Sequence, residues 1–226
     1  MIFNERSYSG KIFRPRPEIF FSEEYRLLIA ATPWGPRSSA KRVIEIIKDY
    51  YSLTLEDGDA TNPFEKLSCL SPTANGLRVS TMLANEKLYR NENDAEYVTG
   101  VELFAAAIDE YEVAWIQIGH PNLLLARKTR GIFPLGSHVD LSLDLSQDKQ
   151  VLSPLPSALL GLDPTCNLTI GSFRPQNGDR LILISRSALS ENIYSLPETN
   201  WQIESISKIL SKNDSELAYW LGILEL

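Results

Sequence analysis

The residues best suited to chemistry follow a short apolar segment near residue 180. A turn at Gly178-Asp179 precedes four apolar residues, 181–184, and polar residues begin at Ser185. Such a run predicts a buried strand that delivers its last side chains to a site. The carboxylate of Asp179 could bind a cation. Arg186, at the other end of the run, carries only hydrogen-bond donors, so it could bind an anion but could not ligate a metal.

Other catalytic patterns are missing from the sequence. The chain has two histidines, His120 and His138, and neither has the spacing of a metal-binding motif. There is no Gly-x-Ser-x-Gly elbow, no Walker loop and no Gly-x-Gly-x-x-Gly motif after a strand. We therefore interpret both histidines as turn or surface residues.

Charge limits the classes of partner. The net charge is −7, from 29 acidic and 22 basic residues, which argues against nonspecific binding to nucleic acid or anionic membranes. We expect no nucleic-acid partner and no membrane partner. A small group of basic residues could still hold one anion: Arg14, Arg16, Lys41 and Arg42. The alternative, which general surface composition favours, is that these are separate solvated charges.

Length and composition predict one domain over residues 1–226. With 226 residues, 43% of them hydrophobic, the chain can bury a sizeable core. No apolar stretch approaches the length of a membrane span, and residues 1–10 lack an apolar signal region, so we expect a cytoplasmic protein. Cys69 and Cys166 are too few and too far apart for a disulfide framework.

The first half of the sequence predicts two helices between strands. Residues 25–31 predict a strand, and Ser38 or Ser39 can cap a helix whose apolar residues share one face. Those apolar residues are Ala40, Val43, Ile44, Ile47 and Tyr51. A loop over 54–66 leads to a second helix around 77–88.

The second half predicts mainly strands. Three of them, 103–108, 113–118 and 123–127, would form an antiparallel meander. Residues 131–164 are rich in Pro, Ser, Gly and Asp and predict a long loop or flap, with one half-exposed strand at 139–145. Further strands are expected at 168–173, 181–185 and 217–224, with a helix over 202–210 before the last.

The order of these motifs resembles that of the PP2C-type (PPM) metal-dependent serine/threonine phosphatases over nearly the whole chain. The matching motifs are Ala84-Asn85, Thr99-Gly100, Ile118-Gly119, Leu160-Gly161-Leu162 and Gly178-Asp179. The resemblance implies an α+β fold, a PP2C-like four-layer α/β/β/α sandwich of two antiparallel sheets flanked by helices.

The resemblance also implies a site for two Mn²⁺ or Mg²⁺ ions, whose bridging water attacks the phosphorus of the substrate. Family members hold these ions with aspartates at strand ends. The corresponding positions here lack most of those carboxylates: they are Thr32, Pro33, His120, Arg186, Asn213 and Asp214. A guanidinium at roughly 4 to 5 Å would repel each metal charge by about 1 to 4 kcal/mol. We therefore expect no metal cofactor.

Two basic positions could bind an anion. Arg14 and Glu18 keep the spacing of the family's phosphate-binding arginine and its neighbouring acid. Arg14 and Arg186 are therefore candidate anion-binding residues. Two alternatives stay open for Arg186: it pairs with Asp214 or Glu18 and fills the emptied acidic site, or it points to solvent.

These expectations predict a pseudophosphatase, a catalytically inactive PP2C-like domain that acts as a protein-binding regulator or scaffold. Its partner would be a phosphoprotein or a kinase. The alternative is an enzyme, a divergent metal-dependent phosphatase that binds Mn²⁺ or Mg²⁺ through Asp214, Glu18 or Asp179. A third possibility is an anionic ligand held between Arg14 and Arg186.

Overall fold

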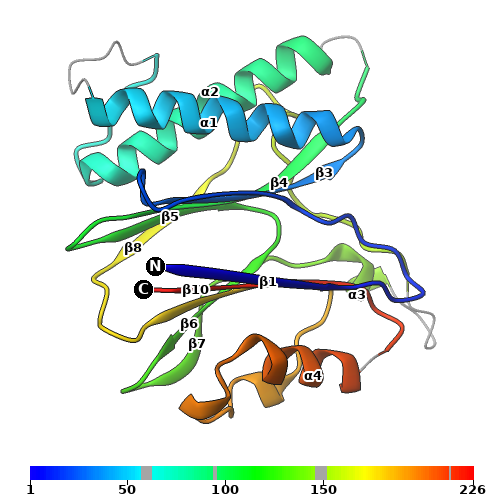
Figure 1. The fold of residues 1–226 in the computed structure, drawn as a ribbon. Coiled ribbons are helices and arrows are strands. Elements are labelled where there is room, and N and C mark those ends of the chain that lie inside the picture. The colour runs from blue at the N-terminus through cyan, green and yellow to red at the C-terminus, as the bar shows by residue number, and fades with distance from the viewer. Residues whose placement is uncertain (57–62, 94–95, 146–151, 214) are drawn as a thin grey trace. The chain divides into compact units, whose positions relative to one another are not determined.

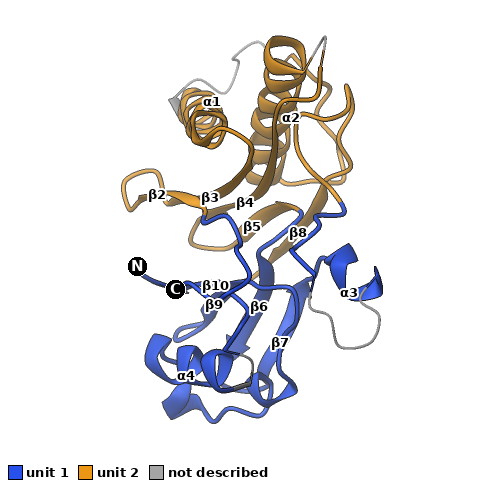
Figure 2. Cartoon of the chain, turned by 90° about the vertical axis from the view of Figure 1, so that its right-hand side faces the viewer, with its two compact units in different colours: residues 1–16, 119–157, 175–226 blue, residues 17–118, 158–174 orange. Residues whose placement is uncertain are grey.

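The computed structural model describes residues 1–56, 63–93, 96–145, 152–213 and 215–226. The chain divides into two compact units. Unit 1 contains residues 1–16, 119–157 and 175–226, and unit 2 contains residues 17–118 and 158–174 (Figures 1 and 2). Each unit holds one five-stranded antiparallel sheet. The chain passes between the units four times, and the expectation of a single domain over residues 1–226 stays a prediction.

Unit 2 combines its sheet with two long helices. The strands, in spatial order, are β2 (Glu18–Ser22), β3 (Leu27–Trp34), β4 (Gly100–Ile108), β5 (Val113–Ile118) and β8 (Thr169–Phe173). The helices α1 (Arg37–Glu56) and α2 (Pro72–Glu92) lie side by side over one face of this sheet (Figure 1).

The helices of unit 2 form where the apolar periodicity predicts them. The predicted stripe of α1, from Ala40 to Tyr51, is buried against α2 and the sheet. Ser71 caps α2 by accepting a hydrogen bond from the amide of Ala74 (3.1 Å), and Pro72 occupies the first turn. The predicted cap of α1 is wrong because the helix already begins at Arg37; the Ser39 hydroxyl instead donates to Glu92 of α2.

Unit 1 places its helices around the second sheet. The strands, in spatial order, are β1 (Ile2–Tyr8), β10 (Tyr219–Glu225), β9 (Arg180–Ser185), β6 (Asn122–Arg127) and β7 (Gly131–Gly136). The helices are α3 (Leu141–Leu145), α4 (Ile203–Asn213) and two 3₁₀ turns, Glu191–Ile193 and Glu198–Asn200. Ile206 and Leu210 of α4 join the core over β9 and β10. Two antiparallel sheets flanked by helices confirm the predicted fold class.

Two predictions about residues 119–164 are wrong: the meander that includes 123–127 and the strand at 139–145. The strand β6 forms as predicted, but it pairs with β9 and β7 and not with β5. Gly119, with φ of 67°, and Pro121, which has no amide hydrogen, interrupt the pairing after β5. The segment 131–164, predicted as a loop or flap, begins with the strand β7. Residues 141–145, predicted to belong to a strand, form the helix α3.

No helix among the described residues is long and apolar enough to cross a membrane.

Candidate functional site

Arg186 lies directly after β9, and its relative exposure is only 2%. Its guanidinium donates a hydrogen bond to the carbonyl of Leu210. Leu210 is the fourth residue from the end of α4, so its carbonyl belongs to the last turn, where no amide of the helix can satisfy it. Arg186 therefore caps the C-terminal end of α4, where a positive charge also interacts favourably with the helix dipole. The alternative that Arg186 points to solvent is wrong.

The ring of Tyr219 forms the second contact of Arg186. The central carbon of the guanidinium lies 6.0 Å from the ring centroid, within the range of a cation–π interaction. The hydroxyl of Tyr219 is hydrogen bonded to Ser207 and Ser211 of α4, and its ring stacks on Tyr8 of β1 at 5.5 Å. Arg186 thus connects β9, β10 and α4 of unit 1.

Arg14, the second candidate anion-binding residue, is in a buried ion pair. Its guanidinium donates to the carboxylate of Asp140 at 3.1 Å, and the two side chains are only 3% and 1% exposed. The same carboxylate accepts hydrogen bonds from the hydroxyl of Ser187 and from the amides of Ser142 (3.0 Å) and Leu155 (2.8 Å). The charge of Arg14 is therefore already neutralised by a carboxylate of the same unit.

The surroundings of Asp140 keep it ionised. Burial by itself raises the pKa of this carboxyl group, but the hydrogen bonds from Ser187, Leu155 and Ser142 outweigh burial. The pKa of Asp140 consequently lies below its ordinary value. A charged Asp140 holds together the N-terminal segment, the end of β9 and the chain around α3.

In unit 2, the predicted metal-site positions are at the end of β3. Thr32 is fully buried and pairs with Glu102 of β4, and Pro33 pairs with Val101. No described residue provides a hydrogen-bond partner for the Thr32 hydroxyl. Directly paired residues share one face of a sheet, so the buried carboxylate of Glu102 lies beside Thr32. The indole of Trp34 donates to that carboxylate at 3.0 Å.

Two of the three carboxylates that the divergent-enzyme alternative offers as metal ligands already have basic partners. Glu18 accepts a hydrogen bond from Arg37 at 2.7 Å. Asp179 is 1% exposed and accepts from Arg127 at 2.6 Å. Asp179 and Arg186 flank the six residues of β9 at opposite ends, and the seven residue steps between them span about 23 Å. Asp179 therefore does not belong to the site around Arg186.

The remaining predicted positions are at the ends of other elements. His120 is 1% exposed and follows Gly119, and its peptide bond to Pro121 is cis. Burial excludes the surface alternative for His120, and the turn alternative stays open because His120 lies between β5 and β6. Asn213 is the last residue of α4, and Asp214 lies outside the described residues.

The side chains at these positions do not fit a pair of hard cations. Two Mn²⁺ or Mg²⁺ ions bring four positive charges and are normally balanced by several carboxylates, whereas Thr32 offers one neutral hydroxyl and Arg186 adds a positive charge. Among the described residues, no group of three or more His, Cys, Asp and Glu side chains could hold a metal ion.

Sequence reasoning missed two buried carboxylates. Glu102 is the one charged residue in the nine-residue strand β4, and a charge within an otherwise apolar run is a detectable signal. Asp140 had no comparable signal, because its partner Arg14 is 126 residues away in the sequence. Three of the five motifs that supported the resemblance meet in unit 2: Asn85 bonds to the amide of Gly161 (2.8 Å), and Asn93 bonds to the carbonyls of Thr99 and Gly161.

No protein-family model matches the sequence, and no curated protein matches it. Solved structures do match the fold over nearly the full length. The PPM Ser-Thr phosphatase MsPP from Mycobacterium smegmatis is 14% identical, with a TM-score of 0.70 and coverage of 100% of this chain and 98% of that chain.

Two further structures show the same likeness. PppA, a key regulatory component of T6SS in Pseudomonas aeruginosa, is 13% identical, with a TM-score of 0.66 and coverage of 99% and 96%. The serine/threonine phosphatase PstP/Ppp of Mycobacterium tuberculosis is 16% identical, with a TM-score of 0.61 and coverage of 100% and 99%. The PstP catalytic domain is also known in complex with two manganese ions. Our chain therefore has the fold of the PPM serine/threonine phosphatases.

Proposed function

We propose that this chain is a pseudophosphatase, a PPM-fold domain that does not hydrolyse phosphoesters and acts as a protein-binding regulator or scaffold. The observation that carries the proposal is the role of Arg186. This residue occupies a position at which the resemblance places a metal-binding aspartate, yet its buried guanidinium caps α4 and contacts Tyr219. Both interactions would be lost if the side chain were withdrawn to admit a dication.

The ion pair of Arg14 supports the same proposal. The resemblance gives Arg14 the role of binding the substrate phosphate. In this chain the buried carboxylate of Asp140 pairs with Arg14, where the family would bind the phosphate. A phosphate would have to displace a carboxylate that several hydrogen bonds hold in position. The contacts of Arg14 therefore disfavour binding of the substrate phosphate, just as those of Arg186 disfavour binding of the metal.

Exposed apolar side chains support a role in protein binding. Leu141, Leu143 and Leu145 of α3 are 37%, 45% and 59% exposed. Grouped apolar side chains on a surface commonly mark interaction sites. The partner that we propose is a phosphoprotein or a kinase. The solved structure of PppA, itself described as a regulatory component, makes regulation a reasonable role for this fold.

The experiment is a calorimetric titration of the purified, chelator-treated protein with Mn²⁺. Turnover of p-nitrophenyl phosphate is followed in the same samples, and an active PPM phosphatase serves as the positive control. We expect neither heat of binding nor turnover. Micromolar Mn²⁺ binding with turnover that Asp214→Ala abolishes would refute the proposal and identify a divergent phosphatase.

A second titration addresses the anion-binding alternative. Inorganic phosphate and phosphopeptides are added separately, and the midpoint of thermal unfolding is followed. Stabilisation by phosphopeptide without hydrolysis would support recognition of a phosphoprotein. Stabilisation by phosphate that Arg14→Gln does not change would exclude Arg14 as the binding residue.

A further inference from the structure

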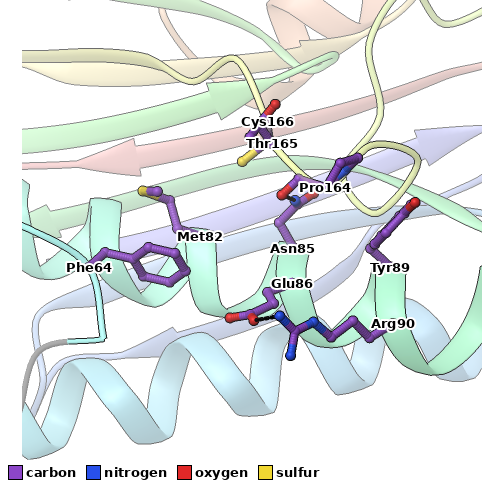
Figure 3. Close-up of a pocket in the computed structure, with 9 residues that line it drawn as sticks. All are labelled: Phe64, Met82, Asn85, Glu86, Tyr89, Arg90, Pro164, Thr165 and Cys166. Carbon is purple, nitrogen blue, oxygen red and sulfur yellow. Dashed lines mark hydrogen bonds and ion pairs between the residues drawn. The ribbon is translucent and has the colours of Figure 1, made fainter. Parts of the chain in front are cut away.

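A pocket in unit 2 is lined by none of the predicted metal-site positions. It lies between the exposed side of α2 and the segment 164–166, with Phe64 at its edge (Figure 3). Its volume is about 360 Å³. That volume is near the lower end of the range for small-molecule sites, so the pocket could take a group with one or two rings.

Most of the lining is apolar or weakly polar. Phe64, Met82 and Pro164 provide apolar surface, and Cys166 adds a thiol. The thioether of Met82 suits an aromatic ligand because sulfur interacts favourably with ring edges. Tyr89 and Thr165 also line the pocket and carry hydroxyl groups that can donate or accept one hydrogen bond.

One wall of the pocket is fixed before any ligand binds. Asn85, only 2% exposed, accepts a hydrogen bond from the amide of Gly161 (2.8 Å) and donates to the carbonyls of Asp163 (2.9 Å) and Pro164 (3.3 Å). Cys166 packs against the core of unit 2. A wall that is already ordered reduces the entropy lost on binding, which favours affinity for a small ligand.

The charges that line the pocket are paired with each other and favour neither an anion nor a cation. Among the nine described residues that line the pocket, Glu86 and Arg90 are the charged ones, and they form an ion pair at 2.7 Å. The two charges offset each other, and the side chains of Arg90 and Glu86 are 71% and 33% exposed, so the pair gives the pocket no net charge that would draw in an anion or a cation. An uncharged ligand leaves the pair intact.

We propose that this pocket binds an uncharged aromatic group that carries one hydroxyl or ring N–H, of the size of p-cresol or indole. The group belongs either to a free small molecule or to an aromatic side chain of a peptide. This inference goes beyond the proposed function and does not rest on it, because no residue of the pocket takes part in the metal or phosphate argument.

The methionines make the proposal directly testable. The chain has only two, and Met82 lines the pocket whereas Met1 does not. With ¹³C-methyl methionine, NMR titration with indole and with p-cresol should move the Met82 resonance saturably and leave that of Met1 unchanged. Benzoate and benzylamine should produce much weaker shifts. No shift of Met82, or equal shifts of both methionines, would overturn the proposal.

Two matched variants separate the pocket from its surroundings. Thr165→Phe places a ring in the pocket, whereas Asn167→Phe adds the same ring at an exposed position outside the lining. The Met82 shift should be lost in the first variant and kept in the second. Loss in both, or retention in both, would contradict the assignment of the site.

The cysteines give an independent readout on the unaltered protein. Burial raises the pKa of the Cys166 thiol to about 11, whereas Cys69 is exposed and outside the pocket. Indole should slow maleimide alkylation of Cys166 and leave that of Cys69 unchanged. An equal effect on both cysteines would count against a pocket ligand.

A final comparison identifies the source of the aromatic group. Indole is compared with N-acetyl-tryptophanamide, which carries the same ring on a peptide-like backbone. Equal or tighter binding of the amide would support the pocket as a site for a peptide side chain. Binding of indole alone would support a site for a free small molecule, and binding of neither compound would refute the proposal.

Discussion

The guanidinium of Arg186 donates a hydrogen bond to the carbonyl of Leu210, in the last turn of α4. Arg186, which aligns with a metal-binding aspartate, thus has a structural role. It donates a hydrogen bond to a carbonyl at the end of a helix, where such groups lack an amide partner within the helix. The contact with Tyr219 adds the strand β10 to the same arrangement. Charge reversal at this position is therefore compatible with a stable fold.

Replacing Arg186 should destabilise the protein. Arg186→Met removes a charge-assisted hydrogen bond and the interaction with Tyr219, so we expect the free energy of unfolding to fall by about 1.5 to 3 kcal/mol. Urea denaturation measures this change. Arg130→Met, at an exposed position between β6 and β7, is the matched control and should be close to neutral. Equal stability of the two variants would contradict a structural role for Arg186.

Removing the charge of Asp140 should have a larger effect. Asp140→Asn leaves the buried guanidinium of Arg14 without its counter-ion, and loss of one partner of a buried pair costs about 3 to 5 kcal/mol. Denaturant unfolding is compared with that of Asp144→Asn, which alters an exposed aspartate in α3. A small effect in both variants would mean that the buried pair is not required for folding.

The acid dependence of stability should contain a contribution from Asp140. Its pKa is lower in the folded protein than in the unfolded chain, so the unfolded state binds the proton more readily. The contribution is complete above the ordinary aspartate pKa of about 3.9 and is lost as pH falls through the lower folded pKa. The stability difference between wild type and Asp140→Asn should be constant from pH 7 to about pH 5 and shrink below about pH 4. A difference that stays constant across the acid range would disprove this assignment.

The sequence predicted the elements whose signal is local. The helices α1 and α2 follow apolar residues at helical spacing, and β4 and β5 follow continuous apolar runs. The edge strands β1 and β7 were missed because β1 is largely polar and exposed and β7 contains Pro134. Residues 139–145 alternate apolar and polar side chains as a strand does. They include α3 because the Asp140 carboxylate accepts the Ser142 amide, as a helix cap does.

The places of the candidate residues in the strand order could be predicted, whereas their contacts could not. Alignment of motifs located Thr32, His120 and Arg186 at strand ends. The partners of the two arginines could not be read from the sequence, because Arg14 meets Asp140 and Arg186 meets Leu210 through tertiary packing. Such contacts depend on how distant segments are folded together and leave no periodic signal.

Two glycines with positive φ, Gly161 of unit 2 and Gly178 of unit 1, offer a matched test of the packing around Gly161. A Cβ on Gly161 (φ +91°) would lie 2.5 Å from the side chain of Leu88, whereas a Cβ on Gly178 (φ +86°) would meet nothing within 4 Å. Gly178→Ala should cost about 1 to 2 kcal/mol through backbone conformation alone. Gly161→Ala should cost more, because Leu88 must also move. Thermal or urea unfolding compares them, and equal losses would show that Leu88 yields without cost.

The most direct test of the central claim is a crystal structure from crystals grown with excess Mn²⁺, with anomalous scattering recorded to locate manganese. We predict that the Arg186 guanidinium remains hydrogen bonded to the Leu210 carbonyl and that no anomalous peak is coordinated by residues at the Thr32, His120 or Arg186 positions. Manganese bound by those residues, with Arg186 withdrawn from α4, would contradict the account and restore the divergent phosphatase as the better explanation.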